Sequence, residues 1–224
     1  MINTPDIDLI RYYERRAPDY EDIYRRPIPE QQTELQMITS AMQAVLAGRR
    51  VLEVACGTGY WTERLAQFTQ HVTAVDTSPS MLKIAESKKL PNDRVRFLSW
   101  DAYKLDKIPG SFDAALINFW VSHISRKYLG EFIRRIHRKA GGSSIVFIAD
   151  NCFAPELGGV FMDAAVGSDT YRIRRLADGT EWKVLKNYYK RDELYQLFAL
   201  HSRDLDIRFG KYYWWLSYSI FESE

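Results

Sequence analysis

The sequence predicts an α/β fold in which a mostly parallel sheet is covered by helices on both faces. Between residues 49 and 149, short apolar runs alternate with segments of helical periodicity. Parallel strands joined by crossover helices give this pattern. The first apolar run enters a Gly-x-Gly turn at residues 57–59. Residues 205–221 instead hold two apolar runs joined at residues 210–211, which predicts a final antiparallel hairpin.

The individual elements follow from the spacing of the apolar residues. Helices are expected over residues 6–16 and 29–46, with Gly48 ending the second. Ser78 and Gly141 are expected to cap later helices at their first and last turns. The alternating part predicts strands at 49–55, 71–76, 94–99, 112–118 and 143–149, and helices at 60–68, 78–90 and 125–140.

The alternation of strands and helices ends after Asp150. Residues 171–187 alternate around Asp178 and Gly179, which predicts a β-hairpin, and a helix is expected from residue 191. The chain contains no internal repeat, low-complexity segment or obvious linker.

Composition narrows the class of protein. The 224 residues are 46% hydrophobic, enough for one large domain, and 31 basic and 29 acidic residues give a net charge of +2. This balance gives no electrostatic reason to expect a nucleic acid or a membrane surface as partner. Two cysteines are too few for a disulfide framework, and no apolar run is long enough to span a bilayer. We expect a cytoplasmic protein, monomeric or homodimeric.

The glycine turn fits either a dinucleotide site or a site for another nucleoside ligand. A dinucleotide site needs a third glycine, where this chain has Thr62, and an acidic residue about twenty positions on, where it has Asp76. Asp76 suits the ribose of any nucleoside ligand, or it caps the next helix. Glu53, inside the first strand, suits a cationic ligand and would repel a pyrophosphate. Asp101, after the third strand, suits an adenine amino group, or it is a turn carboxylate.

Four segments together resemble the successive motifs of class I S-adenosylmethionine-dependent methyltransferases. They are VLEVACGTGYWTERLA, VTAVDTSPSMLKIA, RVRFLSWDAYKL and FDAALINFWVSHISRKYL. The earlier YYERRAPDYEDIY resembles the lid of the small-molecule branch of that family. The resemblance implies a doubly wound, seven-stranded sheet with an antiparallel last strand. It also implies a helical lid (1–48) and a methyltransferase domain (49–224) with an inserted substrate cover (151–190).

The resemblance also implies S-adenosylmethionine as cofactor and S-adenosylhomocysteine as product. Trp100 departs from the family, which often has glycine there, and this side chain either narrows the adenine pocket or points away from it. No metal is implied. By position in the motifs, the ribose is assigned to Asp76, the adenine to Thr77, Asp101 and Ala102, and the methionine end to Ala55, Gly57, Gly59 and Asn118. Glu53 is expected to act indirectly, by organising the loop. Tyr20, in the N-terminal segment with Tyr13, either reaches the carboxylate of the cofactor or packs its helix on the sheet edge.

The acceptor side is less defined by the sequence. His123 follows the fourth strand, and it is either the general base or a packed histidine at a helix start. Tyr13 and Trp120 are the other expected substrate contacts. Arg172 and Arg174 could bind an anionic acceptor, but they share one strand face, which we expect to point to solvent.

The sequence therefore predicts methyl transfer to N or O of a small molecule by in-line displacement. Three alternatives remain at this stage: a protein or RNA methyltransferase, a cofactor-binding protein of this fold without transfer activity, and a nicotinamide-dependent oxidoreductase.

Overall fold

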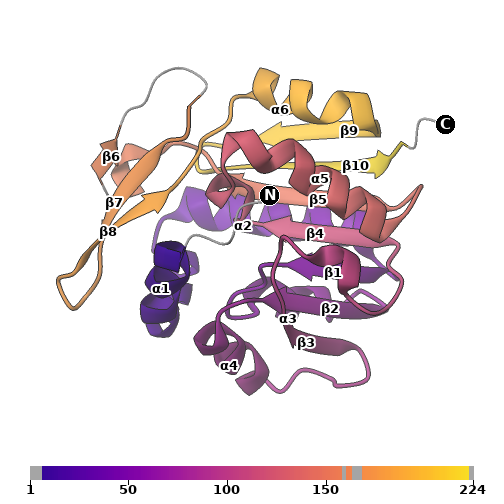
Figure 1. Cartoon of the computed structure of the whole chain (residues 1–224), viewed down its shortest axis with the longest axis horizontal. Coiled ribbons are helices and arrows are strands. Elements are labelled where there is room, and N and C mark those ends of the chain that lie inside the picture. Colours follow the sequence, from indigo (N-terminus) through magenta and orange to yellow (C-terminus); the bar gives the residue numbers. More distant parts are fainter. Residues whose placement is uncertain (1–6, 158–159, 163–167, 222–224) are drawn as a thin grey trace.

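The computed structural model describes residues 7–157, 160–162 and 168–221, and it confirms the predicted α/β class. One sheet of seven strands runs through the molecule in the order β3-β2-β1-β4-β5-β10-β9 (Figure 1). The strands are β1 Arg50–Val54, β2 His71–Asp76, β3 Val95–Ser99, β4 Ala114–Asn118, β5 Ile145–Asn151, β9 Ser202–Phe209 and β10 Tyr213–Ile220.

The direction of the last strand matches the prediction. Strands β1 to β5 pair in parallel, whereas β10 pairs antiparallel with β5 on one side and with β9 on the other. The antiparallel strand is therefore an interior strand, and β9 forms the edge.

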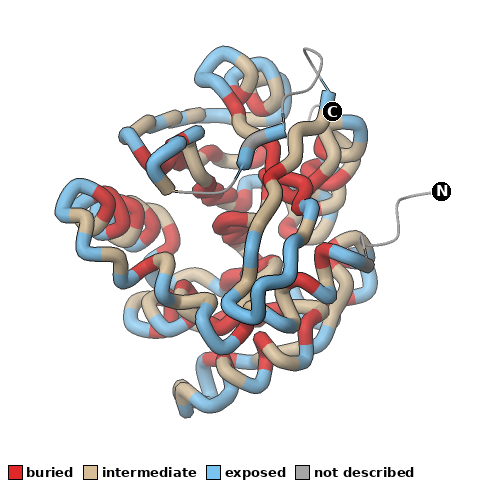
Figure 2. Tube along the Cα trace, turned by 90° about the vertical axis from the view of Figure 1, so that its left-hand side faces the viewer, coloured by how far each residue is buried: buried red, intermediate tan, exposed pale blue. Residues whose placement is uncertain are grey.

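Helices cover both faces of the sheet (Figure 1). Along β1, Leu52 belongs to the core shared with α5 and α6, and Val51 to the core shared with α2 and α3. This alternation is the period of two that a strand imposes. Buried backbone accordingly gathers at the centre of the molecule (Figure 2). The helices are α1 Ile7–Arg16, α2 Pro29–Leu46, α3 Tyr60–Leu65, α4 Pro79–Ser87, α5 Arg126–Ala140 and α6 Arg191–Phe198.

The two predicted helix caps, Ser78 and Gly141, are confirmed. The Ser78 hydroxyl accepts the N–H of Met81 at 3.2 Å and caps α4, and Gly141 ends α5 with φ +84°. Helices α3 and α4 are shorter than expected, ending at Leu65 and Ser87. The 3₁₀ helix η1 (Ala17–Tyr24) was not expected.

The segment after β5 forms a separate small sheet. The predicted hairpin is present as β7 (Tyr171–Arg175) and β8 (Glu181–Leu185), and β6 (Val160–Met162) adds a third strand that the sequence did not indicate. Helix α1 contacts both β8 and α4, so it lies between this sheet and the main one (Figure 1). Helix α2, in contrast, packs on the main sheet as part of its helix layer. The domain division at residue 48 stays a prediction.

A buried carboxylate joins the N-terminal helices to the last hairpin. Glu34 of α2 is 6% exposed and accepts the backbone N–H groups of Lys211, Tyr212 and Tyr213 at 2.7, 3.0 and 3.0 Å. Gly210 leaves room for this contact, because a Cβ there would lie 2.3 Å from the Glu34 Cδ. The turn between β9 and β10 is thus held from the far end of the chain.

Candidate active site

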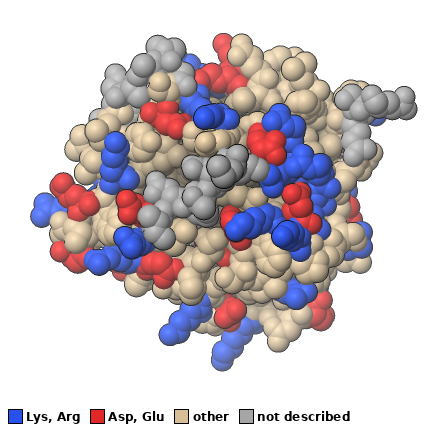
Figure 3. Space-filling view, viewed as in Figure 1, with Lys and Arg blue, Asp and Glu red and all other residues tan. Residues whose placement is uncertain are grey.

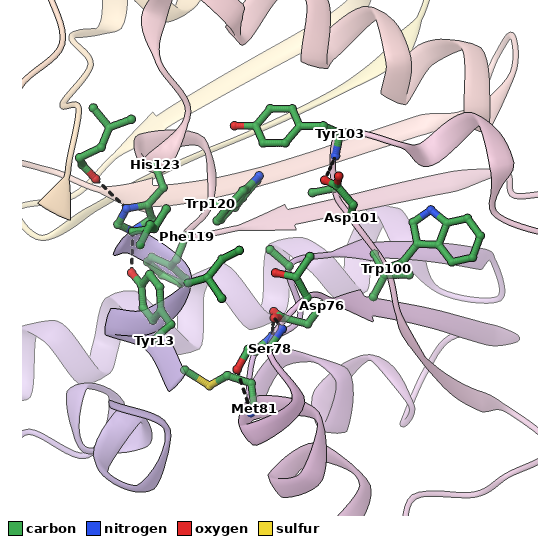
Figure 4. Close-up of a pocket in the computed structure, with 18 of the residues that line it drawn as sticks. Tyr13, Asp76, Ser78, Met81, Trp100, Asp101, Tyr103, Phe119, Trp120 and His123 are labelled. Carbon is green, nitrogen blue, oxygen red and sulfur yellow. Dashed lines mark hydrogen bonds between the residues drawn. The ribbon is translucent and has the colours of Figure 1, made fainter. Parts of the chain in front are cut away.

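A cavity of about 230 Å³ lies at the carboxyl ends of the parallel strands. Ligands of open α/β sheets bind in this position, where the strand order reverses on either side of the first strand. We call it the strand-end cavity. It is lined by Asp76 at the end of β2 and Asp101 after β3 (Figure 4). Ala55 after β1 and Asn118 at the end of β4 also line it.

The backbone around the strand-end cavity is strained. Ala55 and Phe119, which follow β1 and β4, have φ of 56° and 59°, a left-handed region that non-glycine residues rarely adopt. Such conformations persist where the surroundings impose them, and they gather at ligand sites. The two glycines of the turn differ in role. Gly57 lines the cavity, whereas a Cβ on Gly59 would meet the Ala85 Cβ of α4 at 3.0 Å.

Asp76 fixes two turns at once. Its Oδ2 accepts the N–H of Gly57 at 2.8 Å and its Oδ1 accepts the N–H of Ser78 at 2.9 Å. Burial raises the pKa of Asp76, and these backbone hydrogen bonds oppose the shift. The side chain that caps α4 is that of Ser78, not that of Asp76. Asp76 lines the cavity, and each of its carboxylate oxygens has a further lone pair for a ligand hydroxyl.

The residues after β3 form another wall of the strand-end cavity. Asp101 accepts the backbone N–H of Tyr103 at 2.9 Å and pairs with the Lys104 ammonium at 3.2 Å. The Trp100 indole points away from the other labelled residues (Figure 4), and its N–H donates to the Lys104 carbonyl at 2.9 Å. Trp100 is still among the residues that line the strand-end cavity, so the direction of its indole favours, of the two orientations left open by the sequence, the one that points away from the adenine pocket. Ala102 and Thr77 also line this part of the cavity.

Two residues that line the strand-end cavity each have a buried polar atom without a hydrogen-bond partner within the described part of the chain: the Asn118 Oδ1 and the Trp120 Nε1. A buried polar group without a partner costs free energy, so such atoms indicate a place for a ligand. An amide oxygen suits a cationic ligand group, and an indole N–H suits an acceptor.

Glu53 lies behind the glycine turn and is not among the residues that line the strand-end cavity. It is 2% exposed, and it accepts the Thr62 hydroxyl at 2.6 Å. Burial raises the pKa of Glu53 to about 8. Its position therefore favours the indirect role, in which it holds the start of α3 against β1.

His123 and Tyr13 meet at the inner end of the strand-end cavity (Figure 4). The His123 Nδ1 lies 2.7 Å from the Leu185 carbonyl, so it carries the proton, and Nε2 accepts the Tyr13 hydroxyl at 2.8 Å. Burial lowers the pKa of His123 well below 6.5, and the charge of Lys186 lowers it further. A histidine with an engaged lone pair and a lowered pKa is a weak proton acceptor, which favours a wall over a base.

The N-terminal segment closes over the strand-end cavity through two carboxylates. Glu14 of α1 accepts the hydroxyls of Ser78 and Ser80 at the start of α4. Glu21 of η1 accepts the Thr58 hydroxyl at 2.9 Å, within the glycine turn, and the Lys88 ammonium at 2.7 Å. From here on we use the name lid for α1 and η1 alone, a part of the predicted lid segment. The sequence pointed to its tyrosines but not to these acidic contacts.

Further residues line the strand-end cavity without having been singled out in the sequence. A helical period alone does not distinguish a cavity-facing side chain from a core one, which is why Leu9 and Ile10 of α1 gave no signal. Tyr103 and Tyr128 lie near positions that a motif marked. The unanticipated lining residues include Leu9, Ile10, Met81, Tyr103, Tyr128 and Tyr171.

Among the described residues, no cluster of three or more His, Cys, Asp or Glu is placed to hold a metal ion, and both cysteines are free. No helix in the described ranges is both long enough and apolar enough to cross a membrane. On the face seen in Figure 3, basic and acidic side chains are interspersed.

Known proteins share parts of this chain. Residues 51–141 match the family described as "Methyltransferase domain". A demethylmenaquinone methyltransferase of Clavibacter sepedonicus is 35% identical over 113 residues, 50% of this chain and 45% of the relative. A malonyl-[acyl-carrier protein] O-methyltransferase of Paenibacillus sp. is 30% identical over 159 residues, 65% of this chain and 55% of the relative. The chain thus spans about half the length of the curated relatives it matches.

Solved structures match over nearly the whole chain. The "DhpI-SAM-HEP complex" superposes with a TM-score of 0.79 at 23% identity, covering 97% of this chain and 99% of the other. A 1,6-didemethyltoxoflavin-N1-methyltransferase of Burkholderia thailandensis has a TM-score of 0.64 at 18% identity, covering 99% and 92%. These likenesses show the fold. Residues 51–141 therefore form a methyltransferase domain, and the resemblance of this chain to the class I S-adenosylmethionine-dependent methyltransferases is confirmed.

Proposed function

We propose that this protein binds S-adenosylmethionine in the strand-end cavity and transfers its methyl group to N or O of a small-molecule acceptor. One observation carries the proposal. The cavity at the strand ends combines a fixed carboxylate, Asp76, with an unpartnered buried amide oxygen, Asn118 Oδ1. Such a pair fits a ligand that has both ribose hydroxyls and a cationic amino acid end.

The residues present fit the cofactor. Asp76 would hold the ribose hydroxyls, Asp101 and Ala102 would border the adenine, and Asn118 would face the methionine end. When bound, the cofactor supplies a methyl group already activated on a sulfonium, so the protein mainly has to orient the two reactants and exclude water.

The chain's own residues suit this limited task. The lid covers the strand-end cavity, and Tyr13 and His123 form the wall at its inner end. Because His123 is neutral and its Nε2 is engaged, we expect an acceptor that needs no proton removed by this residue. We also propose that the protein is a cytoplasmic monomer or homodimer that acts without nucleic acid. Free cysteines and balanced charge are consistent with this proposal.

The test is isothermal titration calorimetry with S-adenosylhomocysteine, with NADH as the control ligand. Wild type should bind S-adenosylhomocysteine with a micromolar Kd or tighter, and Asp76→Ala should bind it at least about tenfold more weakly, as loss of a charged hydrogen-bond acceptor predicts. A well-folded wild type that binds NADH, or neither ligand, would exclude the proposal. Release of S-adenosylhomocysteine from S-adenosylmethionine in the presence of an acceptor would then separate a transferase from a protein that only binds the cofactor.

A further inference from the structure

A second cavity, of about 80 Å³, lies on the far side of Tyr13 and His123 from the strand ends. Tyr13, Tyr20, Phe119 and His123 line both cavities, so these four side chains form the boundary between them. A molecule in the second cavity would therefore lie directly beside the strand-end cavity.

The lining of the second cavity is strongly basic, and we call it the cationic cavity. It is bordered by Arg16, Arg26, Arg172, Arg174 and Lys186, and none of the described residues that line it is Asp or Glu. These residues come from α1, the segment after η1, β7 and the segment after β8, so folding brings together charges that are far apart in the sequence.

Lys186 belongs to a neutral network, because its charge is balanced by a buried carboxylate within the protein. The Lys186 ammonium pairs with the buried Asp150 at 3.2 Å and donates to Ser122 and Asn151 at 2.7 Å. Arg172 is 2% exposed, so the expectation that its strand face points to solvent was wrong. Alternation did place Arg172 and Arg174 on one face, but that face lines the cavity.

The arginines lie close enough to affect one another. Burial lowers the pKa of Arg26, and the charges of Arg16 and Arg174 lower it further. Burial likewise lowers the pKa of Arg172, with Arg174 adding to the shift. Within the described part of the chain, neither Arg16 nor Arg26 has a carboxylate within salt-bridge distance. Clustered guanidinium groups of this kind are well suited to planar or tetrahedral oxyanions.

A third cavity, of about 390 Å³, adjoins the cationic cavity and shares Tyr12, Arg16, Arg26 and Arg174 with it. Arg15 and Arg175 add to its rim, together with Asp19 and Asp178, and Asp178 is paired with Arg15 at 3.1 Å. The excess of basic side chains around the two cavities attracts anions and disfavours cations.

We infer that the methyl acceptor is a small oxyanion, carboxylate or phosphoryl in type, whose charged group lies in the cationic cavity with its reacting atom against Tyr13 and His123. This inference rests on the proposed function and adds the class of its substrate. The inner volume holds only a few heavy atoms, about the size of one such group. Transfer forms a bond from the methyl carbon to an unprotonated oxygen of the anionic group, so no proton has to be removed. It breaks the bond from that carbon to sulfur, whose electron pair stays on the thioether product.

The test measures anion binding directly. Inorganic phosphate and malonate are titrated into the full chain by calorimetry, with and without S-adenosylhomocysteine, and malonamide is the uncharged control. Variants Arg26→Gln and Arg174→Gln remove one cavity charge each. Arg11→Gln is the matched control, because Arg11 lies on α1 with its side chain 66% exposed and lines none of the three cavities.

We expect wild type to bind at least one anion and not malonamide. Arg26→Gln and Arg174→Gln should each weaken that Kd by about tenfold or more, as loss of a charge-assisted hydrogen bond predicts, and Arg11→Gln by less than about twofold. Binding of phosphate over malonate assigns the phosphoryl class, and the reverse assigns the carboxylate class.

Two outcomes would overturn the inference without touching the proposed function. One is a wild type that binds S-adenosylhomocysteine but neither anion. The other is anion binding that all three variants weaken equally, because the anion would then respond to net charge alone. Conversely, anion binding that depends on Arg26 and Arg174 in a protein that fails to bind S-adenosylhomocysteine would leave the anion site standing and refute the methyltransferase proposal.

Discussion

The contact of Glu21 with Lys88 should decide how tightly the lid closes. Its two charged atoms are 2.7 Å apart, and the side chains are only 15% and 14% exposed. Exposed pairs contribute about 0–1 kcal/mol, whereas removing one partner of a fully buried pair costs about 3–5 kcal/mol. This mostly buried pair, with the added hydrogen bond from the Thr58 hydroxyl, lies between these limits, at about 1–3 kcal/mol. Glu21→Gln should shift lid closure by that amount.

The assay is calorimetric binding of S-adenosylhomocysteine at pH 7. Because the lid covers the strand-end cavity, Glu21→Gln should raise the Kd by about 5- to 150-fold. Asp22→Asn is the control, since it removes the same charge from the next residue, whose side chain is 74% exposed and lies 4.0 Å from Arg25. It should change the Kd by less than about twofold. Trypsin should also cut within residues 15–26 faster in Glu21→Gln, where arginines flank the contact.

The pH dependence of this effect has a definite sign. Burial raises the pKa of Glu21, but hydrogen bonds from Lys88 and Thr58 outweigh it and lower the pKa below 4.5. A carboxylate with a lowered pKa contributes above its ordinary pKa and loses its contribution as pH falls through the lowered value. The difference between wild type and Glu21→Gln should therefore persist from pH 6 to 8 and narrow only below pH 4.5. Equal affinities of wild type and Glu21→Gln at pH 7 would refute the lid argument.

Three further measurements follow from the structure. Glu34→Ala leaves three buried backbone N–H groups without an acceptor, so the Tm should fall by roughly 10 °C in thermal unfolding followed by circular dichroism; a fall below about 2 °C would contradict the assigned contact. Gly210→Ala should lower the Tm by about 5 °C or more because its Cβ meets the Glu34 carboxyl, and in the Glu34→Ala background the same change should cost clearly less. The His123 ring should stay neutral from pH 6 to 8 when its nitrogen chemical shifts are followed by NMR, and an imidazolium signal at pH 6 would restore the base hypothesis. Because the unfolded chain binds a proton at this histidine that the folded chain does not, His123 should reduce the free energy of unfolding as the pH falls below 6.5.

The sheet was predictable because buried parallel strands have a distinctive sequence pattern. Runs such as the one ending at Val54 are buried on both faces, and the turn after it has positive φ at Gly57 and Gly59. Ser78 identified the start of α4 because its own side chain makes the cap. These signals are local, so a single sequence contains them.

The unpredicted features depend on contacts between distant residues. Arg16 and Arg174 are unremarkable in their own segments, and only the docking of α1 beside β8 places them in one cavity. Strand β6 is short and pairs only with β7, so its pattern is weak. Glu53 was placed near the ligand by its motif, but which way its carboxyl turned depended on Thr62. Long-range packing of this kind leaves no regular spacing of residues in the sequence that would reveal it.

The interior position of β10 in the sheet constrains the order in which the strands can pair during synthesis. β10 is the last of the seven strands to be synthesised, yet it lies between β5 and β9, and its turn supplies the N–H groups that Glu34 accepts. Until residues 213–220 have left the ribosome, β5 has an open edge, β9 has no partner in the sheet, and the Glu34 carboxylate of α2 has none of its three donors. Closing contacts across so much chain is slow, since the entropy of the intervening loop must be overcome first. A nascent chain that stalls before β10 therefore leaves the edge of β5 unpaired, and an open edge of this kind favours aggregation.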